Sequence, residues 1–175
     1  DCGNATSNSA SLTVNPPSMC ITNAGFEGGF TSGIGNNWTK WQSVSNTCTG
    51  YDETSVVRSG SHSQRIRIYN TAGGTTYGGV YQRVPVTSGQ SYSVSYYLRA
   101  YDSSSYCYLG VDPYGGTSGT SGNVVWSSGS NSTSWVQKTW NGTAQSNYIT
   151  IFLRVRSTDT NKRNGYFDDG SPGCP

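Results

Sequence analysis

The chain has 175 residues with a formal net charge of +2, and only 11% of its residues are charged. This length suits one well-buried domain and leaves too little for a second complete one. The small charge argues against nucleic-acid binding through bulk electrostatics, and no stretch approaches the roughly 18 apolar residues that a membrane span needs. We expect a soluble monomer that binds neither nucleic acid nor membranes.

The composition predicts an all-β chain. Glycine, serine, threonine, asparagine and tyrosine dominate, and 13 tyrosines and five tryptophans stand against only two glutamates. Most of these residues are mediocre helix formers that are common in turns and strands. The first ten residues, DCGNATSNSA, lack the basic start and apolar core of a signal peptide, so we expect the chain to begin at a processed boundary.

Residues 1–17, DCGNATSNSASLTVNPP, differ from the rest of the chain. They alternate small polar and apolar residues toward SLTV and stop at a Pro-Pro pair, which predicts one strand followed by a stiff linker. The stretch resembles the end of a bacterial immunoglobulin-like repeat; a disordered leader is the alternative. We place a boundary here, with the main domain at residues 18–175.

From residue 19 onward, alternating apolar and polar residues predict a series of short strands. The clearest are residues 63–70, 79–86, 91–101, 106–113 and 147–157. In the last of these, Ile149 and Ile151 share one face, and Arg154 and Arg156 lie on the other. About eight to ten strands with Gly-rich turns and no helical period predict a sandwich of two antiparallel sheets.

The five cysteines favour disulfides over a metal site. They form no CxxC pair and have only one histidine, His62, for company, so a zinc site lacks properly spaced ligands. Disulfides place the protein outside the cytoplasm, as a secreted protein. Any four cysteines allow three pairings. We expect Cys20–Cys174, which brackets the main domain, and Cys48–Cys107, which leaves Cys2 without a partner.

Five motifs carry a resemblance to a known family. They are NAGFEGGF (23–30) with NNWTKW (36–41), VVRSGSHSQRIRI (56–68), GVYQRVPVTSGQSYSVSYYLRA (79–100), SWVQKTWNGTA (134–144) and YFDDG (166–170). In this order they resemble the jelly-roll carbohydrate-binding modules of the family 4, 9 and 22 group over about residues 20–171. The resemblance implies a galactose-binding-like jelly roll that binds polysaccharide.

The resemblance also implies a structural calcium ion, far from the sugar. Its first-strand ligand would be Glu27, with Asn23 in the same motif, and its last-strand ligand would be Asp168 or Asp169. Carbonyl oxygens near Ser61 would complete the set. Calcium takes six to eight hard oxygens and accepts carbonyls, so two or three carboxylates suffice. The alternative for Glu27 is a hydrogen-bonded surface carboxylate without metal.

A sugar-binding face needs aromatic rings that stack on a pyranose and planar polar groups that reach its hydroxyls or carboxylates. Six of the eight arginines fall in predicted strands, opposite the apolar positions. Arginine forks onto carboxylates and sulfates, so these arginines favour an acidic polysaccharide, with neutral β-glucan or xylan and a merely solvated face as alternatives. The predicted contacts are Arg65, Arg67, Arg83, Tyr97, Arg99, Tyr101, Tyr106, Tyr108, Arg154 and Arg156, with Tyr81 beside them and Trp38 and Trp41 at the cleft edge.

The sequence favours binding over catalysis. Glycoside hydrolysis needs two carboxylates about 5 to 10 Å apart, and the most suggestive acids are already assigned to calcium. No GxSxG motif occurs, and a catalytic triad would have to use the lone His62. We predict a non-catalytic module that targets a larger secreted enzyme or surface protein, with a tethered catalytic domain, to polysaccharide. The alternatives are a protein-binding adhesion module and, behind it, a polysaccharide lyase or hydrolase domain.

Overall fold

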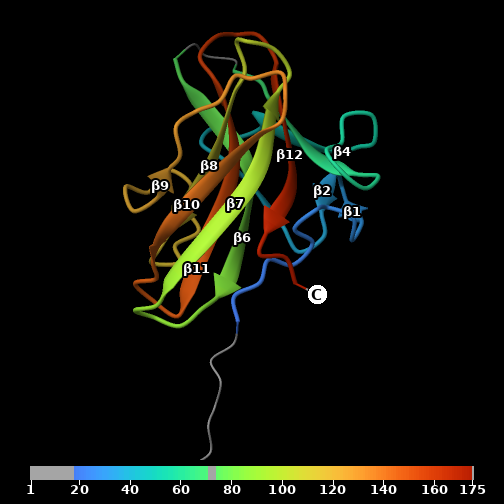
Figure 1. Ribbon diagram of the computed structural model, residues 1–175. Coiled ribbons are helices and arrows are strands. Elements are labelled where there is room, and N and C mark those ends of the chain that lie inside the picture. The colour runs from blue at the N-terminus through green and yellow to red at the C-terminus, as the bar shows by residue number, and fades with distance from the viewer. Residues whose placement is uncertain (1–17, 71–73, 175) are drawn as a thin grey trace, which may run out of the picture.

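Two five-stranded antiparallel sheets make up a β-sandwich in the computed structural model, which describes residues 18–70 and 74–174. The front sheet has the order β10-β7-β12-β5-β4 and the back sheet the order β3-β6-β11-β8-β9; β7 and β10 face the viewer in Figure 1. The front sheet contains β4 (Cys48–Glu53), β5 (Ser63–Ile68), β7 (Ser91–Ala100), β10 (Val136–Thr143) and β12 (Arg163–Ser171). The back sheet contains β3 (Thr39–Gln42), β6 (Thr76–Pro85), β8 (Tyr106–Asp112), β9 (Val125–Trp126) and β11 (Tyr148–Ser157), and β1 (Phe30–Thr31) pairs with β2 (Ile34–Gly35) in a separate hairpin.

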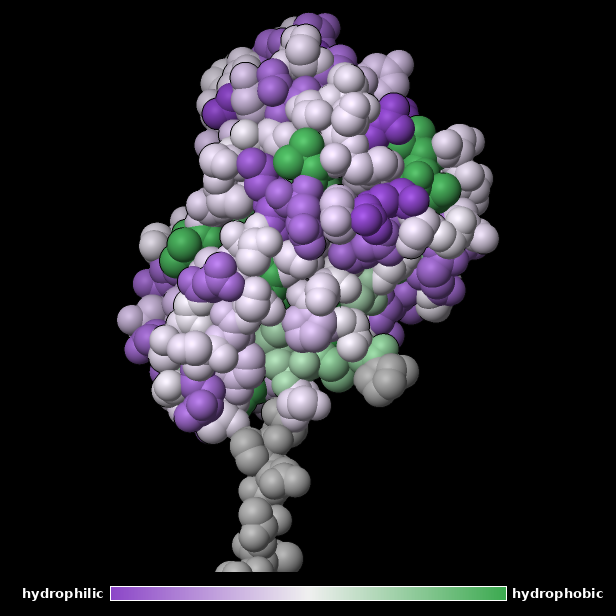
Figure 2. Space-filling model, in the orientation of Figure 1, coloured by the Kyte–Doolittle hydropathy of each residue, from purple (hydrophilic) through white to green (hydrophobic). Residues whose placement is uncertain are grey.

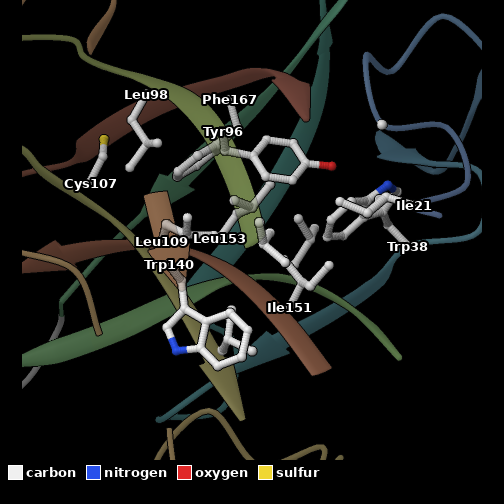
Figure 3. Close-up of a cluster of buried hydrophobic side chains, with 14 of the residues drawn as sticks. Ile21, Trp38, Tyr96, Leu98, Cys107, Leu109, Trp140, Ile151, Leu153 and Phe167 are labelled. Carbon is white, nitrogen blue, oxygen red and sulfur yellow. The ribbon is translucent and has the colours of Figure 1, made fainter. Parts of the chain in front are cut away.

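The predicted fold class is confirmed, and each of the five clearest predicted strands corresponds to a long strand of the sandwich. Alternation decides which side chains meet between the sheets, because successive residues of a strand point to opposite faces. Leu98, Leu109, Leu153 and Phe167 are all fully buried there (Figure 3), as is Ile66. Burying each such side chain stabilises the fold by about 1.5–3 kcal/mol. No described segment forms a helix long and apolar enough to cross a membrane.

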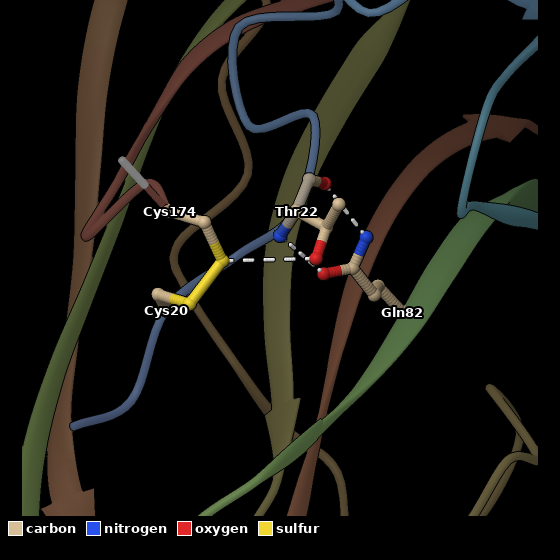
Figure 4. Close-up of a disulfide and its surroundings, with 4 residues drawn as sticks. All are labelled: Cys20, Thr22, Gln82 and Cys174. Carbon is tan, nitrogen blue, oxygen red and sulfur yellow. Dashed lines mark hydrogen bonds between the residues drawn. A yellow bond between two sulfur atoms is a disulfide. The ribbon is translucent and has the colours of Figure 1, made fainter. Parts of the chain in front are cut away.

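A disulfide joins the two ends of the sandwich domain, as predicted. Cys20 and Cys174 are bonded across 154 residues of sequence. Next to them, Ile21 pairs with Gly173 in a parallel bridge. Figure 4 shows how Thr22 continues this junction: its backbone N–H donates to Gln82 Oε1 (2.9 Å), and Gln82 Nε2 donates to the Thr22 carbonyl oxygen (2.8 Å). The first and last described segments are thereby fixed to each other and to β6.

The predicted Cys48–Cys107 disulfide is wrong, because both residues are free, buried thiols. Cys48 lies on β4 at the edge of the front sheet, whereas Cys107 on β8 packs against Gly165 of β12. In the front sheet β5 separates β12 from β4. Two strand spacings, about 10 Å, exceed the Cα separation of about 7 Å that a disulfide allows. Cys2 and the predicted immunoglobulin-like strand lie outside the described residues.

Trp38 also departs from its predicted place at the edge of a cleft. Its side chain is buried in the core, where its ring lies 5.4 Å from that of Phe26 and meets Tyr96 edge-on at 5.8 Å. Its indole Nε1 donates to the carbonyl oxygen of Asn23. The NNWTKW motif therefore places one tryptophan inside the sandwich and the other, Trp41, on the outer face of the back sheet.

Candidate functional site

The predicted sugar contacts are divided between two opposite outer faces, so they do not all belong to one site. Arg65, Arg67, Tyr97, Arg99 and Tyr101 belong to the front sheet, where Tyr101 directly follows β7. The back sheet carries Arg83, Tyr106, Tyr108, Arg154 and Arg156. Alternation showed correctly that these side chains point away from the core, but it does not say which strands are neighbours.

The outer face of the back sheet is rich in aromatic rings, and we call it the aromatic face. It is formed by Trp41, Tyr77, Tyr81, Tyr106, Tyr108, Trp126, Phe152, Arg154 and Arg156. Phe152 is its fully buried centre, with the rings of Tyr81, Trp41 and Trp126 within 5.6 to 6.0 Å of its own. A sheet normally leaves its outer face polar, so a second apolar cluster here indicates a surface built for contact.

Arg154 lies among the rings of this face. Its guanidinium carbon is 3.5 Å from the ring centroid of Trp126 and 4.4 Å from those of Tyr77 and Tyr108. No acidic side chain among the described residues forms a salt bridge with Arg154 or with Arg156, which lies 4.5 Å from the ring of Tyr106. Burial lowers the pKa of Arg154 to about 10, although the neighbouring tyrosines oppose that change. A cation without an anion is thus held in a nearly apolar surrounding.

Glycines make the hollow beside Arg154. Gly79 lies between Trp41 and Arg154 in the sheet register, so no side chain fills that position. The loop after β8 returns over the sheet, and a Cβ at Gly119 would lie 2.6 Å from the ring of Trp41. The resulting cavity has a volume of about 180 Å³. It is lined by Tyr77, Gly119, Thr120, Ser121, Trp126 and Arg154.

Polar atoms without partners gather on the same face. Seven buried side-chain polar atoms of the described residues make no hydrogen bond within the protein. Five of them lie on the outer face of the back sheet: Trp41 Nε1, Asp112 Oδ2, Thr150 Oγ1, Arg154 Nε and Arg156 Nε. Native proteins leave few such atoms unpaired, and a ligand or ordered water is the usual reason when they do. The aromatic face is therefore the candidate functional site.

The predicted calcium residues converge on the loop before β5. Glu27 Oε1 accepts the backbone N–H groups of Ser61 and His62 (2.9 Å each), so it holds the far side of this loop. Asp168 Oδ2 accepts the backbone N–H of Arg58 (2.8 Å). Burial raises the pKa of Asp168 to about 6, although this and the neighbouring backbone N–H groups lower it. Asp169 forms a salt bridge with Arg58.

Asp168 and Asp169 both reach this loop, where simple alternation would send only one of them. The strand is irregular after Asp168, and Asp169 has a positive φ of 47°. Asp169, Asn23 and Glu27 line a cavity of about 570 Å³, and Asp168 does not. Their hard oxygens suit calcium in type. No group of three His, Cys, Asp or Glu side chains among the described residues could hold a metal, so carbonyl oxygens or water would have to complete the site. The calcium ion stays a prediction.

Sequence reasoning missed several residues of the aromatic face. Trp126 is in a two-residue strand within a Ser- and Gly-rich loop, where no periodicity marks its direction. Tyr77 precedes two glycines, and it was not assigned to a strand. Its only signal is the spacing of four residues to Tyr81 in β6, which places both on one face. Arg83, by contrast, does not line the cavity at Arg154, and its guanidinium carbon lies 3.8 Å from the ring centroid of Tyr148.

No family model matches this chain, and no curated protein matches it. Solved structures share its fold. TmCBM61 in complex with beta-1,4-galactotriose is 16% identical with a TM-score of 0.59, and the alignment covers 88% of this chain and 97% of that one. The CBM22-1 xylan-binding domain of Paenibacillus barcinonensis Xyn10C is 16% identical with a TM-score of 0.55, covering 92% and 95%. The bacteriophage CBA120 tailspike protein 4 is 10% identical with a TM-score of 0.62, covering 87% of this chain and 21% of that one. At such identities the similarity concerns the fold alone.

Proposed function

We propose that this chain is a non-catalytic carbohydrate-binding module that holds a polysaccharide against the aromatic face. The observation that carries the proposal is the guanidinium of Arg154, which has no carboxylate partner among the described residues and lies over the rings of Trp126, Tyr77 and Tyr108 in the lining of the cavity. Rings stack on the apolar side of a pyranose, and polar groups between them bond to its substituents. Two structures that share the fold are described as a complex with galactotriose and as a xylan-binding domain, which supports the same function.

The ligand that suits this face best is an acidic polysaccharide. Arg154 and Arg156 bring two positive charges that no described carboxylate neutralises. A carboxylate or sulfate on a sugar ring would supply the missing negative charge and form two parallel hydrogen bonds with a guanidinium. A neutral xylan or galactan would bind only by stacking on the rings and by hydrogen bonds from its hydroxyl groups.

The module would serve a larger secreted enzyme or surface protein. Binding an insoluble polysaccharide would raise the effective concentration of substrate for a tethered catalytic domain. The Cys20–Cys174 disulfide supports an oxidising, extracellular location. Catalysis is not part of the proposal, because none of the residues that line the cavity at Arg154 is acidic. A calcium ion at Glu27 and Asp169 would act structurally, as a link between the first segment and β12.

Native gels that contain polygalacturonate, a sulfated galactan, xylan or β-glucan test this function directly. We expect the anionic polymers to retard the chain, and added salt to weaken the retardation because it screens the charges. Retardation by the neutral polymers alone would overturn the acidic ligand and keep the aromatic face as a neutral site. No retardation in any gel would refute sugar binding and favour a protein-binding module.

A further inference from the structure

The outer face of the front sheet carries a second group of arginines, on the opposite side of the sandwich from Arg154. We call it the arginine face and define it by Tyr51, Arg65, Arg67, Arg99, Tyr101, Asn164 and Tyr166. In the sheet register, Tyr166 lies opposite Arg99 on one side and opposite Arg65 on the other. Figure 2 views this face and shows strongly hydrophilic side chains gathered over β7, β12 and the neighbouring part of the sheet.

A buried amide holds two of these arginines in fixed positions. Asn164 is only 6% exposed, and its Oδ1 accepts the Nε–H groups of both Arg65 and Arg67 at 3.2 Å. Arg67 also donates from Nη1 to the hydroxyl of Tyr51 at 3.0 Å. The guanidinium groups are therefore oriented by the protein before any ligand arrives, which lowers the entropic cost of binding.

The charge of this face is not balanced. Arg65 has one salt bridge, to Glu53 at 3.4 Å, whereas neither Arg67 nor Arg99 forms one within the described part of the chain. The Nε atom of Arg99 is buried and has no hydrogen-bond partner in the protein. Two strand spacings place Arg99 about 10 Å from Arg65 across the sheet. Like charges at such distances repel one another, and bound anions would remove that repulsion.

Exposed tyrosines lie beside the arginines of the arginine face. Tyr101 is 60% exposed and lies beside Asn164, to whose carbonyl oxygen its backbone N–H donates at 3.1 Å. Tyr69, 43% exposed, follows Arg67 at the end of β5. A ring next to a guanidinium suits a sugar ring that bears an acidic group, because the ring stacks and the arginine binds the acid.

We propose that the arginine face is a second, separate binding site for an acidic polysaccharide. Its carboxylate or sulfate groups lie on Arg67 and Arg99, and a pyranose ring stacks on Tyr101. The two sites are separated by the full thickness of the core, so one chain of this protein can link two polymer chains. The arginine face does not depend on the site at Arg154, and either site can exist without the other.

The number of anionic probe molecules bound per chain, measured on variants of each face, distinguishes the two sites. The probes are oligogalacturonate for carboxylates, sulfated galactan oligomers for sulfates, and neutral xylo-oligosaccharide as the reference. We expect Arg154→Gln/Arg156→Gln, the aromatic-face variant, to keep the anionic site on the arginine face. We expect Arg67→Gln/Arg99→Gln, the arginine-face variant, to keep the anionic site on the aromatic face. Each arginine lost should weaken its own site about tenfold, as expected for a charge-assisted hydrogen bond.

Lys138→Gln/Lys162→Gln is the control, since it also removes two positive charges but at positions outside both sites. Tyr101→Ala serves as a second variant, because this exposed side chain can be removed without opening the core. The proposal is overturned if Arg154→Gln/Arg156→Gln binds neither anionic probe, because the aromatic face would then be the single anionic site of the unmodified chain. It is also overturned if the lysine control weakens binding as much as Arg67→Gln/Arg99→Gln. Failure of every variant and of the unmodified chain would overturn both sites together.

Discussion

Replacing Arg154 with methionine should separate a binding role from a structural one. Methionine keeps most of the apolar stem of the side chain and removes the guanidinium group, which lies over the rings of Trp126, Tyr77 and Tyr108. The structure leaves that charge without a carboxylate partner, and burial already lowers its pKa to about 10. The rings around this cation therefore offset the cost of its burial, and no carboxylate contributes.

The expected change in stability is small, because two effects oppose each other. Three cation–π contacts at about 0.5–1 kcal/mol each would be lost. The desolvation cost of a buried charge, about several kcal/mol, would be recovered. We expect the free energy of unfolding to change by less than about 1 kcal/mol. Affinity for an acidic polysaccharide should fall by about 1.5–3 kcal/mol, which is roughly tenfold to a hundredfold.

Urea denaturation and affinity electrophoresis in polygalacturonate measure the two quantities on the same preparation. Arg154→Lys is the matched variant, because it keeps the charge and loses the planar fork, and we expect it to bind at an intermediate level. If Arg154→Met lost about 3 kcal/mol of stability or more while binding stayed unchanged, Arg154 would be a structural residue and the reasoning would be refuted.

Three further predictions concern separate parts of the molecule. Trp126→Ala should weaken the binding of both acidic and neutral glycans by about 1–3 kcal/mol without unfolding the chain. Unchanged binding to every polymer would exclude the ring of Trp126 from the site. Burial raises the pKa of Cys48 and Cys107 to about 12. Both should therefore resist alkylation in the native state and react in urea. If neither reacted in urea and the mass of the chain were two hydrogen atoms below that expected with both thiols free, the two residues would form a disulfide. Millimolar calcium should raise the melting temperature and EDTA should lower it, and Glu27→Gln should remove this response; no calcium effect, with Glu27→Gln still destabilising, would leave Glu27 as a hydrogen-bond acceptor only.

Local chemistry shows why the loop before β5 needs its acids whether or not calcium binds. Glu27 and Asp168 accept backbone N–H groups of this loop, and Asp169 neutralises Arg58. The position of Glu27 in the glycine-rich segment 25–29, unusual in a chain with so few carboxylates, is thereby explained by contacts that the structure contains.

The sequence by itself determined the fold class and the direction of most side chains. Period-two alternation is a local property of a strand, so it correctly sent Ile151 and Leu153 inward and Arg154 outward. The bracketing cysteines also predicted the Cys20–Cys174 disulfide.

Only the tertiary structure decided which strands are neighbours. Alternation says whether a side chain points in or out, but two sheets have two outer faces, and hydrogen bonding between distant segments assigns each strand to one of them. Arg99 and Arg154 share a predicted direction and yet lie on opposite sides of the core. The same long-range pairing keeps Cys48 and Cys107 apart and turns Trp38 into the core, because these placements depend on the strands that come to lie beside them.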